Sequence, residues 1–405
     1  MGFIIRHLFK PTFWPAVLVL AAVGCHRNDG DDRDSQPDPA LAAQGKEIFR
    51  FDTFGDETKW TDTLRLHEAV RTAVDPTTAL SVGLKVDSEA LPASVVQGIQ
   101  NGTISLTSPA TTVALLKLNA VVGLKGTVDG TDTLIRLGVT CALCHSTVDN
   151  SFAPGIGKRL DGWPNRDLNP GAIIALSPAL TPAQKAVFNS WGKGKYDARF
   201  NLDGLNGPTV IPPAFGLLGV HRITFTGDGE EIAYWNRYVA VTQMGGHGSF
   251  SDSRTGVSVT NGPDDQVSSK LPALQAYQLS LASPAPPAGS FDSAAAERGK
   301  AVFNGQGACS TCHSGEKFTD ANDRLHQPSE TVGEPEPNGA PSYAARSATK
   351  QYRTTPLRGI WQHPPYFHNG SAATLETVVQ TYNTRKGLNL SAAQMADLVQ
   401  YLKSL

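Results

Sequence analysis

Four of the five cysteines lie in two copies of one short motif, Cys141-Ala-Leu-Cys144-His145 and Cys309-Ser-Thr-Cys312-His313. Thiols three residues apart face one side of a helical turn and can attach to the two vinyl groups of a haem, while the next imidazole points at the iron. A zinc site would leave both histidines without a role, and a redox dithiol does not need them. The motifs therefore predict two covalently bound c-type haems, with His145 and His313 as axial iron ligands.

The ligand on the opposite face of each iron decides the chemistry. An open position lets O₂ or peroxide bind, whereas a Met, His or Tyr ligand favours electron transfer. Residues 146–220 contain neither His nor Met, so the candidates for the first haem are Met244 and His247. Each has an ordinary alternative, because Met244 can be a core residue and His247 can cap a loop.

The first 25 residues have the layout of an export signal, with a basic start, an apolar run over residues 13–23 and then Gly24-Cys25. The run is too short to span a bilayer. Ala22-Val23-Gly24-Cys25 resembles a lipobox, in which the cysteine is acylated; ordinary cleavage without a lipid is the alternative. The sequence therefore predicts a periplasmic or cell-envelope protein, held at the membrane only by a lipid on Cys25, with a flexible tether over residues 26–42.

The chain of 405 residues is long enough for two or three ordinary globular domains. Its formal net charge is −2 and it has no dense block of Lys and Arg, which argues against a nucleic-acid partner. With four cysteines in the motifs and Cys25 in the lipobox, no cysteine is left for a disulfide.

A short pattern occurs twice, as Gln44-Gly45-Lys46-x-x-Phe49 and as Arg298-Gly299-Lys300-x-x-Phe303, and both copies have helical spacing. The second copy leads directly into Cys309, but about ninety residues separate the first from Cys141. We therefore expect an insertion at about residues 50–140, with a hairpin of strands over residues 121–128 and 133–139.

A proline-rich stretch over residues 283–290 marks the best domain boundary. The expected fold is mainly α, with two cytochrome c-like haem domains, long loops and a small N-terminal insertion that contains the hairpin. The N-terminal haem domain would span residues 43–282, the linker 283–292 and the C-terminal cytochrome c domain 293–405. Residues 327–346 are predicted to form a long surface loop.

The C-terminal part carries motifs that resemble those of one family. Tyr352-Arg-Thr-Thr-Pro-Leu-Arg358, Pro365-Tyr-Phe-His368-Asn-Gly and Tyr382-Asn383 are similar to segments of the bacterial di-haem cytochrome c peroxidase and MauG superfamily. The resemblance covers the chain from about Cys141 to its end. It implies that the C-terminal haem transfers electrons, and that Tyr382 occupies the position of its distal ligand, which is Met in the peroxidases and Tyr in MauG.

In the first domain, Pro208-Thr209, Phe225-Thr-Gly-Asp-Gly229 and Gln243-Met244-Gly245 resemble family segments, with two departures. The tryptophan between the haems is replaced at Thr226, which leaves Trp235 or Trp163 as substitutes. The distal glutamate becomes Gln243, whose amide cannot shuttle a proton, so cleavage of peroxide should lose the roughly 10²–10⁴-fold that a general acid supplies unless His247 takes over.

The resemblance also implies an interdomain calcium site at Asn206, Thr354 and Pro356, although chance similarity explains these residues equally well. The leading functional reading is a peroxidase- or MauG-like redox protein, with H₂O₂ or O₂ as oxidant and a small redox protein or quinol-linked chain as electron partner. The alternatives are a di-haem electron-transfer protein without turnover, and an O₂-dependent oxygenase that resembles the rubber oxygenases.

Overall fold

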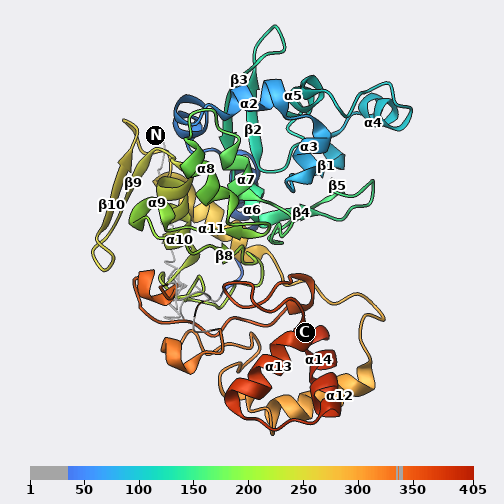
Figure 1. Cartoon of the computed structure of the whole chain (residues 1–405), viewed down its shortest axis with the longest axis vertical. Coiled ribbons are helices and arrows are strands. Elements are labelled where there is room, and N and C mark those ends of the chain that lie inside the picture. Colours follow the sequence, from blue (N-terminus) through green and yellow to red (C-terminus); the bar gives the residue numbers. More distant parts are fainter. Residues whose placement is uncertain (1–34, 334–335, 337–340) are drawn as a thin grey trace, which may run out of the picture. The chain divides into compact units, whose positions relative to one another are not determined.

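The computed structural model describes residues 35–333, 336 and 341–405. Short α-helices dominate this part of the chain, and the strands form small two-stranded pairings (Figure 1). The α-helices are α1 (Pro39–Phe51), α2 (Leu66–Ala73), α3 (Pro76–Ser81), α4 (Ala93–Gln100), α5 (Pro109–Lys117), α6 (Ala142–His145), α7 (Pro170–Ala175), α8 (Pro182–Asn189), α9 (Phe200–Asp203), α10 (Ile232–Tyr238), α11 (Leu271–Ser280), α12 (Ser293–Asn304), α13 (Leu375–Lys386) and α14 (Ala392–Lys403).

Each strand pairs with one other strand, antiparallel except for β1 with β5. The pairs are β1 (Val86–Asp87) with β5 (Ile156–Gly157), β2 (Leu124–Val128) with β3 (Leu134–Val139), β4 (Ser146–Val148) with β6 (Arg159–Asp161), β7 (Lys195–Tyr196) with β8 (Thr209–Val210), and β9 (Gly248–Asp252) with β10 (Val257–Asn261). Two segments are π-helices, η2 (Thr58–Thr63) and η4 (Val239–Met244). The described part is thus mainly helical, as expected, with a minor share of strand.

The first helix begins earlier than the sequence suggested. The side chain of Asp38 accepts hydrogen bonds from the backbone N–H groups of Ala40 and Leu41, and Pro39 stands at the start of α1. These are the features of a helix N-terminus. The prediction of a tether up to residue 42 is therefore wrong at its end, since α1 begins at Pro39. The predicted signal and Cys25 lie outside the described residues.

The repeated glycine pattern corresponds to a repeated helix crossing. A Cβ atom added to Gly45 of α1 would lie 1.8 Å from the carbonyl oxygen of Ala273 in α11. One added to Gly299 of α12 would lie 2.0 Å from the carbonyl oxygen of Asp397 in α14. In both pairs only glycine lets the two backbones approach this closely.

The same two helix pairs share an aromatic contact. The ring centroids of Phe49 and Tyr277 are 5.4 Å apart, and those of Phe303 and Tyr401 are 5.2 Å apart, both edge to face. Edge-to-face packing of this kind stabilises a pair beyond its buried area. The two copies of the pattern therefore build equivalent helix pairs, each made of one helix before a motif and one helix after it.

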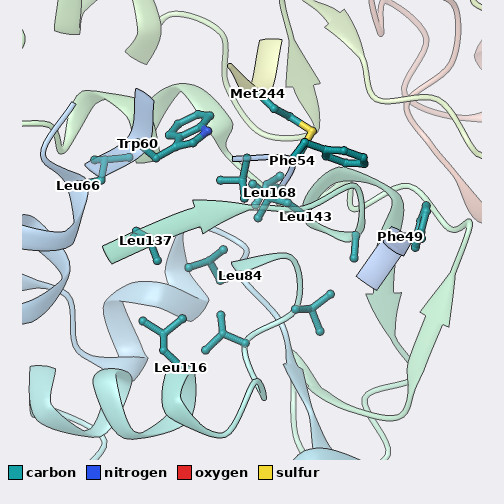
Figure 2. Close-up of a cluster of buried hydrophobic side chains, with 14 of the residues drawn as sticks. Phe49, Phe54, Trp60, Leu66, Leu84, Leu116, Leu137, Leu143, Leu168 and Met244 are labelled. Carbon is teal, nitrogen blue, oxygen red and sulfur yellow. The ribbon is translucent and has the colours of Figure 1, made fainter. Parts of the chain in front are cut away.

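The apolar core is divided in the same way. One large cluster of buried side chains surrounds the first motif, and Figure 2 shows part of it, including Phe49, Leu116 and Met244. A smaller cluster formed by α12, α13 and α14, which lie together in Figure 1, surrounds the second motif. The stretch between α11 and α12 contains neither helix nor strand. The chain from Gln36 onward nevertheless forms one compact unit.

The region predicted as an insertion belongs to the large cluster. Strands β2 and β3 form the antiparallel hairpin, and β3 ends at Val139, two residues before Cys141. Leu116 of α5 and Leu134 of β3 are completely buried. The hairpin thus leads the chain into the first motif, and the insertion shares the core of that motif.

Residues 327–346 are not a simple surface loop. Within their described part, Tyr343 is 5% exposed and Ala344 is completely buried. The expectation of a surface loop is wrong here because both residues pack with Tyr352 in a small apolar cluster. Across residues 35–333, 336 and 341–405, every helix is too short or too polar to span a bilayer.

Candidate haem sites

The first motif forms a single helical turn at the end of the hairpin. The backbone N–H of His145 donates to the carbonyl oxygen of Cys141 at 3.2 Å, which closes the turn. The Nδ1 atom of His145 donates to the carbonyl oxygen of Pro212 at 3.1 Å. This bond fixes the ring and leaves Nε2 as the atom available to a metal, the usual arrangement of a histidine ligand.

The second motif repeats both hydrogen bonds, although Cys309–Thr311 form a 3₁₀ turn and not an α-helical one. The backbone N–H of His313 donates to Cys309 O at 2.9 Å, and Nδ1 donates to Phe318 O at 3.1 Å. Burial lowers the pKa of His145 to about 4 and also lowers the pKa of His313. Both imidazoles are therefore neutral near pH 7, which is the state in which histidine binds a metal.

The cysteines of both motifs are free thiols in the described part of the chain. Burial raises the pKa of Cys141 and Cys144 to about 12 and that of Cys309 to about 11. Neutral thiols in an apolar setting are inert toward disulfide exchange. This environment suits thiols that become thioethers of a haem.

A cavity of ≈ 210 Å³ opens beside the first motif and is lined by Cys141, Cys144 and His145. Most other lining side chains are apolar, and they include residues of α2, α7, β3 and α10. The buried Nε atom of Arg353, another lining residue, has no hydrogen-bond partner. Two thiols, an oriented imidazole, apolar walls and one unpaired guanidinium group fit a c-type haem.

Gln243 also lines this cavity, from the last turn of η4. Its Oε1 accepts a hydrogen bond from Tyr196 Oη at 3.1 Å, and its Nε2 donates to Thr242 Oγ1 at 2.8 Å. Burial raises the pKa of Tyr196 above its usual range, so the phenol keeps its proton. One N–H of the Gln243 amide remains for a molecule in the cavity, since Nε2 carries two hydrogens.

Met244 and His247 diverge after η4. Met244 is 5% exposed and lines the cavity together with Gln243. Gly245 follows with a φ of 89°, and the chain turns away. Nδ1 of His247 bonds to Asp264 Oδ1 at 2.8 Å, and His247 is not among the lining residues in the described part of the chain. The structure thus brings Gln243 to His145, but not His247.

Tyr382, the predicted ligand of the second iron, lies on α13. Burial raises the pKa of its phenol, and the nearby thiols of Cys309 and Cys312 raise it further. Its side chain packs against the apolar cluster that Cys309 also contacts. Met395 also belongs to this cluster, where its sulfur accepts a hydrogen bond from Asn383 Nδ2 at 3.4 Å.

Trp163 lies next to the first motif and contacts a residue of the C-terminal part of the chain. The backbone N–H of Gly162 donates to His145 O at 2.8 Å. The ring centroid of Trp163 lies 5.9 Å from that of Trp361, in the turn η10 (Ile360–Gln362). Trp235 instead stacks on Tyr238 at 4.6 Å and lines the cavity. Of the two tryptophans considered, Trp163 is the one in contact with the C-terminal part.

The predicted calcium ligands have other partners. Oδ1 of Asn206 accepts from Trp191 Nε1 at 2.9 Å, and the carbonyls beside it, of Leu205 and Gly207, accept from the guanidinium group of Arg346. The carbonyl of Thr354 accepts from Thr319 Oγ1. Pro356 is half-buried. The calcium site stays a prediction.

Among the aromatic and charged residues of the cavity, no role was predicted from the sequence for Trp60, Tyr196, Tyr343 or Arg353. Trp60 belongs to the π-helix η2 in the insertion, and Tyr343 and Arg353 follow the second motif in the chain. Because no local spacing connects them to Cys141, only the tertiary structure brings them together. Arg353 lies within the Tyr352–Arg358 motif, which was the one available signal.

The fold and the paired motifs define a c-type haem protein. The RoxA-like, cytochrome c-like family matches residues 351–388. The methylamine utilization protein MauG of Methylorubrum extorquens is 31% identical over 124 residues, covering 27% of this chain and 34% of that protein. The cytochrome-c peroxidase IdrP2 of a Pseudomonas species is 32% identical over 143 residues, covering 27% of this chain and 39% of that one.

The diheme peroxidase BthA from Burkholderia thailandensis has a TM-score of 0.41 and 18% identity, covering 91% of this chain and 86% of that chain. The aligned part of this chain spans less than half of the two curated relatives. The sequence matches confirm the predicted resemblance of this chain to MauG and the di-haem cytochrome c peroxidases. Its cofactor is c-type haem.

Proposed function

We propose that the chain is a di-haem oxidoreductase in which the haem at His145 is the reaction centre and the haem at His313 exchanges electrons. One observation carries the proposal: the cavity at His145 holds the hydrogen-bonded pair Gln243 and Tyr196 among apolar walls. Few polar groups, placed at one point of an apolar cavity, are typical of a substrate site.

Bound haem supplies an iron that can bind peroxide or O₂ and accept or donate electrons. Gln243 then holds the reacting molecule through its remaining N–H. Tyr196 orients the amide by donating to Oε1 at 3.1 Å. Since neither group is acidic near pH 7, this pair positions a ligand better than it transfers a proton.

Electrons would pass between the two haems through Trp163 and Trp361. Their rings are 5.9 Å apart and edge to face. Trp163 follows a residue bonded to the backbone of His145, and Trp361 lies beside the apolar cluster of the second motif. Tyr382 would be the distal ligand of the second iron, and as an anionic oxygen donor it would stabilise the ferric state.

The cellular setting belongs to the same proposal. We place the protein in the periplasm or cell envelope, held by a lipid on Cys25, with a small redox protein or a quinol-linked chain as electron partner. The N-terminal haem domain ends near residue 282 and the C-terminal domain begins near residue 293, where α12 starts.

Two other functions each have one supporting observation. Met244 lines the cavity, so it could be a sixth ligand of the first iron, which would make the protein an electron carrier without turnover. The mainly apolar wall instead favours an O₂-dependent oxygenase with an apolar substrate, in line with the RoxA-like match. Consumption of O₂ with an unsaturated hydrocarbon, in the absence of peroxide, distinguishes the oxygenase.

Absorption and EPR spectra of the ferric protein, recorded before and after addition of H₂O₂, test the proposal. We expect one high-spin haem that responds to peroxide and one low-spin haem. Two low-spin haems that do not respond would refute it. The variant Met244→Ala is the matched control, because a protein that becomes high-spin only after this change uses Met244 as a ligand.

A further inference from the structure

Two residues from beyond the second motif line the cavity of the first. Tyr343 and Arg353 lie 30 and 40 residues after His313 in the sequence, yet both border the cavity that contains His145. Arg353 is held in place by its backbone N–H, which donates to Phe225 O at 2.9 Å. The C-terminal part of the chain thus supplies a cation to the wall of the first haem site.

The guanidinium group of Arg353 lacks an acidic partner. Its Nη1 donates to Arg222 O at 2.6 Å, and its buried Nε has no partner. No ion pair of Arg353 is recorded within residues 35–333, 336 and 341–405. Four other arginines with little exposure, Arg50, Arg159, Arg199 and Arg346, each pair with an aspartate. Arg166 is like Arg353 in that it donates to a carbonyl oxygen, that of Pro365, and has a buried Nε without a partner, but it does not line the cavity in the described part of the chain.

A buried cation without an anion is costly. Burial lowers the pKa of Arg353 to about 10, with no opposing contribution from a carboxylate. Such a charge is normally retained only when it is paired, so an anion from outside the polypeptide would stabilise it. The cavity that Arg353 lines is the place where that partner would lie.

We propose that Arg353 binds a propionate carboxylate of the haem attached at Cys141 and Cys144. A guanidinium group offers two parallel N–H donors that match the two oxygens of a carboxylate. The inference rests on the proposed function, since it needs a haem at the first motif. Beyond the proposed function, the inference states that the C-terminal part of the chain supplies a positive charge that affects the midpoint potential of the first haem.

The midpoint potential of the first haem tests this role. Loss of a positive charge beside the haem favours the ferric state, so Arg353→Gln should lower this potential by about 59 mV, the equivalent of a tenfold change in the one-electron equilibrium. The potential of the variant should also become more dependent on pH, because a propionate without its cation takes up a proton more readily. Arg353→Lys, which keeps the charge, should remain near the wild-type potential.

The matched control is Arg298→Gln, which removes an exposed arginine that pairs with Asp397 on the helix pair of the second motif. It should shift neither potential. The potential of the second haem is read separately in a Cys141→Ala/Cys144→Ala protein, which retains only that haem. An Arg353→Gln protein whose first haem keeps its potential, or whose two potentials move together, overturns the inference.

If Arg353→Gln does not fold, resonance Raman spectra of the wild type and of Arg353→Lys test whether Arg353 binds a propionate. The propionate bending bands should differ, because lysine cannot form the two parallel bonds; identical bands overturn the inference. Measuring the haem content by the pyridine haemochrome assay distinguishes failure of the proposed function from failure of the role of Arg353. A wild-type chain without haem at the first motif refutes the proposed function, whereas a fully loaded chain with an unmoved potential refutes only the role of Arg353.

Discussion

Tyr196 and Gln243 form a hydrogen-bonded pair, with 3.1 Å between the phenol oxygen and Oε1, in the wall of the cavity that contains His145. They come from β7 and η4, 47 residues apart. The resemblance to the peroxidases implies a glutamate at position 243. The hydrogen bonds of this pair show how the amide of Gln243 is accommodated in the wall instead. Tyr196 satisfies its oxygen, and Thr242 takes one of its two N–H groups.

Gln243→Glu should accelerate the reaction with peroxide, because a carboxylate restores a group that can accept and return a proton. The gain should approach the roughly 10²–10⁴-fold of general acid–base catalysis. Stopped-flow absorbance of the haem bands after mixing with H₂O₂ measures it. Tyr196→Phe is the control, which should not accelerate the reaction. An unchanged rate in Gln243→Glu means that another group already handles the proton.

Tyr382→Phe should change the second haem alone. If the phenol oxygen binds the iron, its removal leaves an open position, so the ferric EPR signal of this haem should become high-spin. Tyr382→Met should raise the midpoint potential, because a thioether stabilises the ferrous state. Tyr401→Phe, in the same apolar cluster, is the control. A spectrum of Tyr382→Phe identical to the wild type would show that Tyr382 only packs.

Gly45→Ala and Gly299→Ala should both destabilise the protein. In each helix pair the new methyl group would meet a backbone carbonyl within 2.0 Å, and overpacking of this kind costs about 1–3 kcal/mol. Thermal or urea unfolding measures the loss. Gly130→Ala is the control, since an added Cβ there has no atom within 4 Å. Equal stability of all three variants would contradict the close helix crossings.

Arg346→Met should also reduce the free energy of unfolding. Arg346 and Asp197 are almost fully buried, and their side chains are 2.9 Å apart. Removing one partner of a buried ion pair costs about 3–5 kcal/mol. Arg65→Met breaks the exposed pair with Glu68 and should cost at most about 1 kcal/mol. Similar losses in the two variants would show that the buried pair contributes little.

His363 should make the protein sensitive to acid. Burial lowers its pKa to about 3, whereas an unfolded chain takes up this proton below about pH 6.5. Its contribution to stability is therefore present above pH 6.5 and is lost as the pH falls toward 3, by up to about 1.4 kcal/mol per pH unit. Urea unfolding of His363→Asn between pH 7 and pH 4.5 should show a smaller decline than the wild type. An equal decline in the wild type and in His363→Asn would show that this ring does not cause the acid sensitivity.

The sequence identified the parts of the sites that depend on local spacing. Cys141, Cys144 and His145 must share one helical turn, so their positions could be read directly, and the same holds for the second motif. The π-helix η4 was not predicted. Gln243 and Met244, which the family motif singled out as candidates, line the cavity, and their roles stay predictions.

Contacts between residues that are far apart in the sequence could not be predicted from local spacing. Trp60 and Arg353 reach the first cavity from opposite ends of the chain, and only packing brings them together. His247 is four residues from Gln243, yet Gly245, in the left-handed region of φ, directs the chain away before His247. The short sequence distance suggested that His247 could act beside Gln243. The direction of the backbone depends on φ values, which residue spacing does not reveal.

The position of Arg353 also has a consequence for biosynthesis. A polypeptide emerges from the ribosome with its N-terminus first, so the first motif is made more than two hundred residues before Arg353. Until that residue and Tyr343 have docked, one wall of the first cavity is missing. If haem is attached at Cys141 and Cys144 as we propose, both thiols are accessible for longer than the finished structure suggests, and folding of the C-terminal part then closes the first cavity.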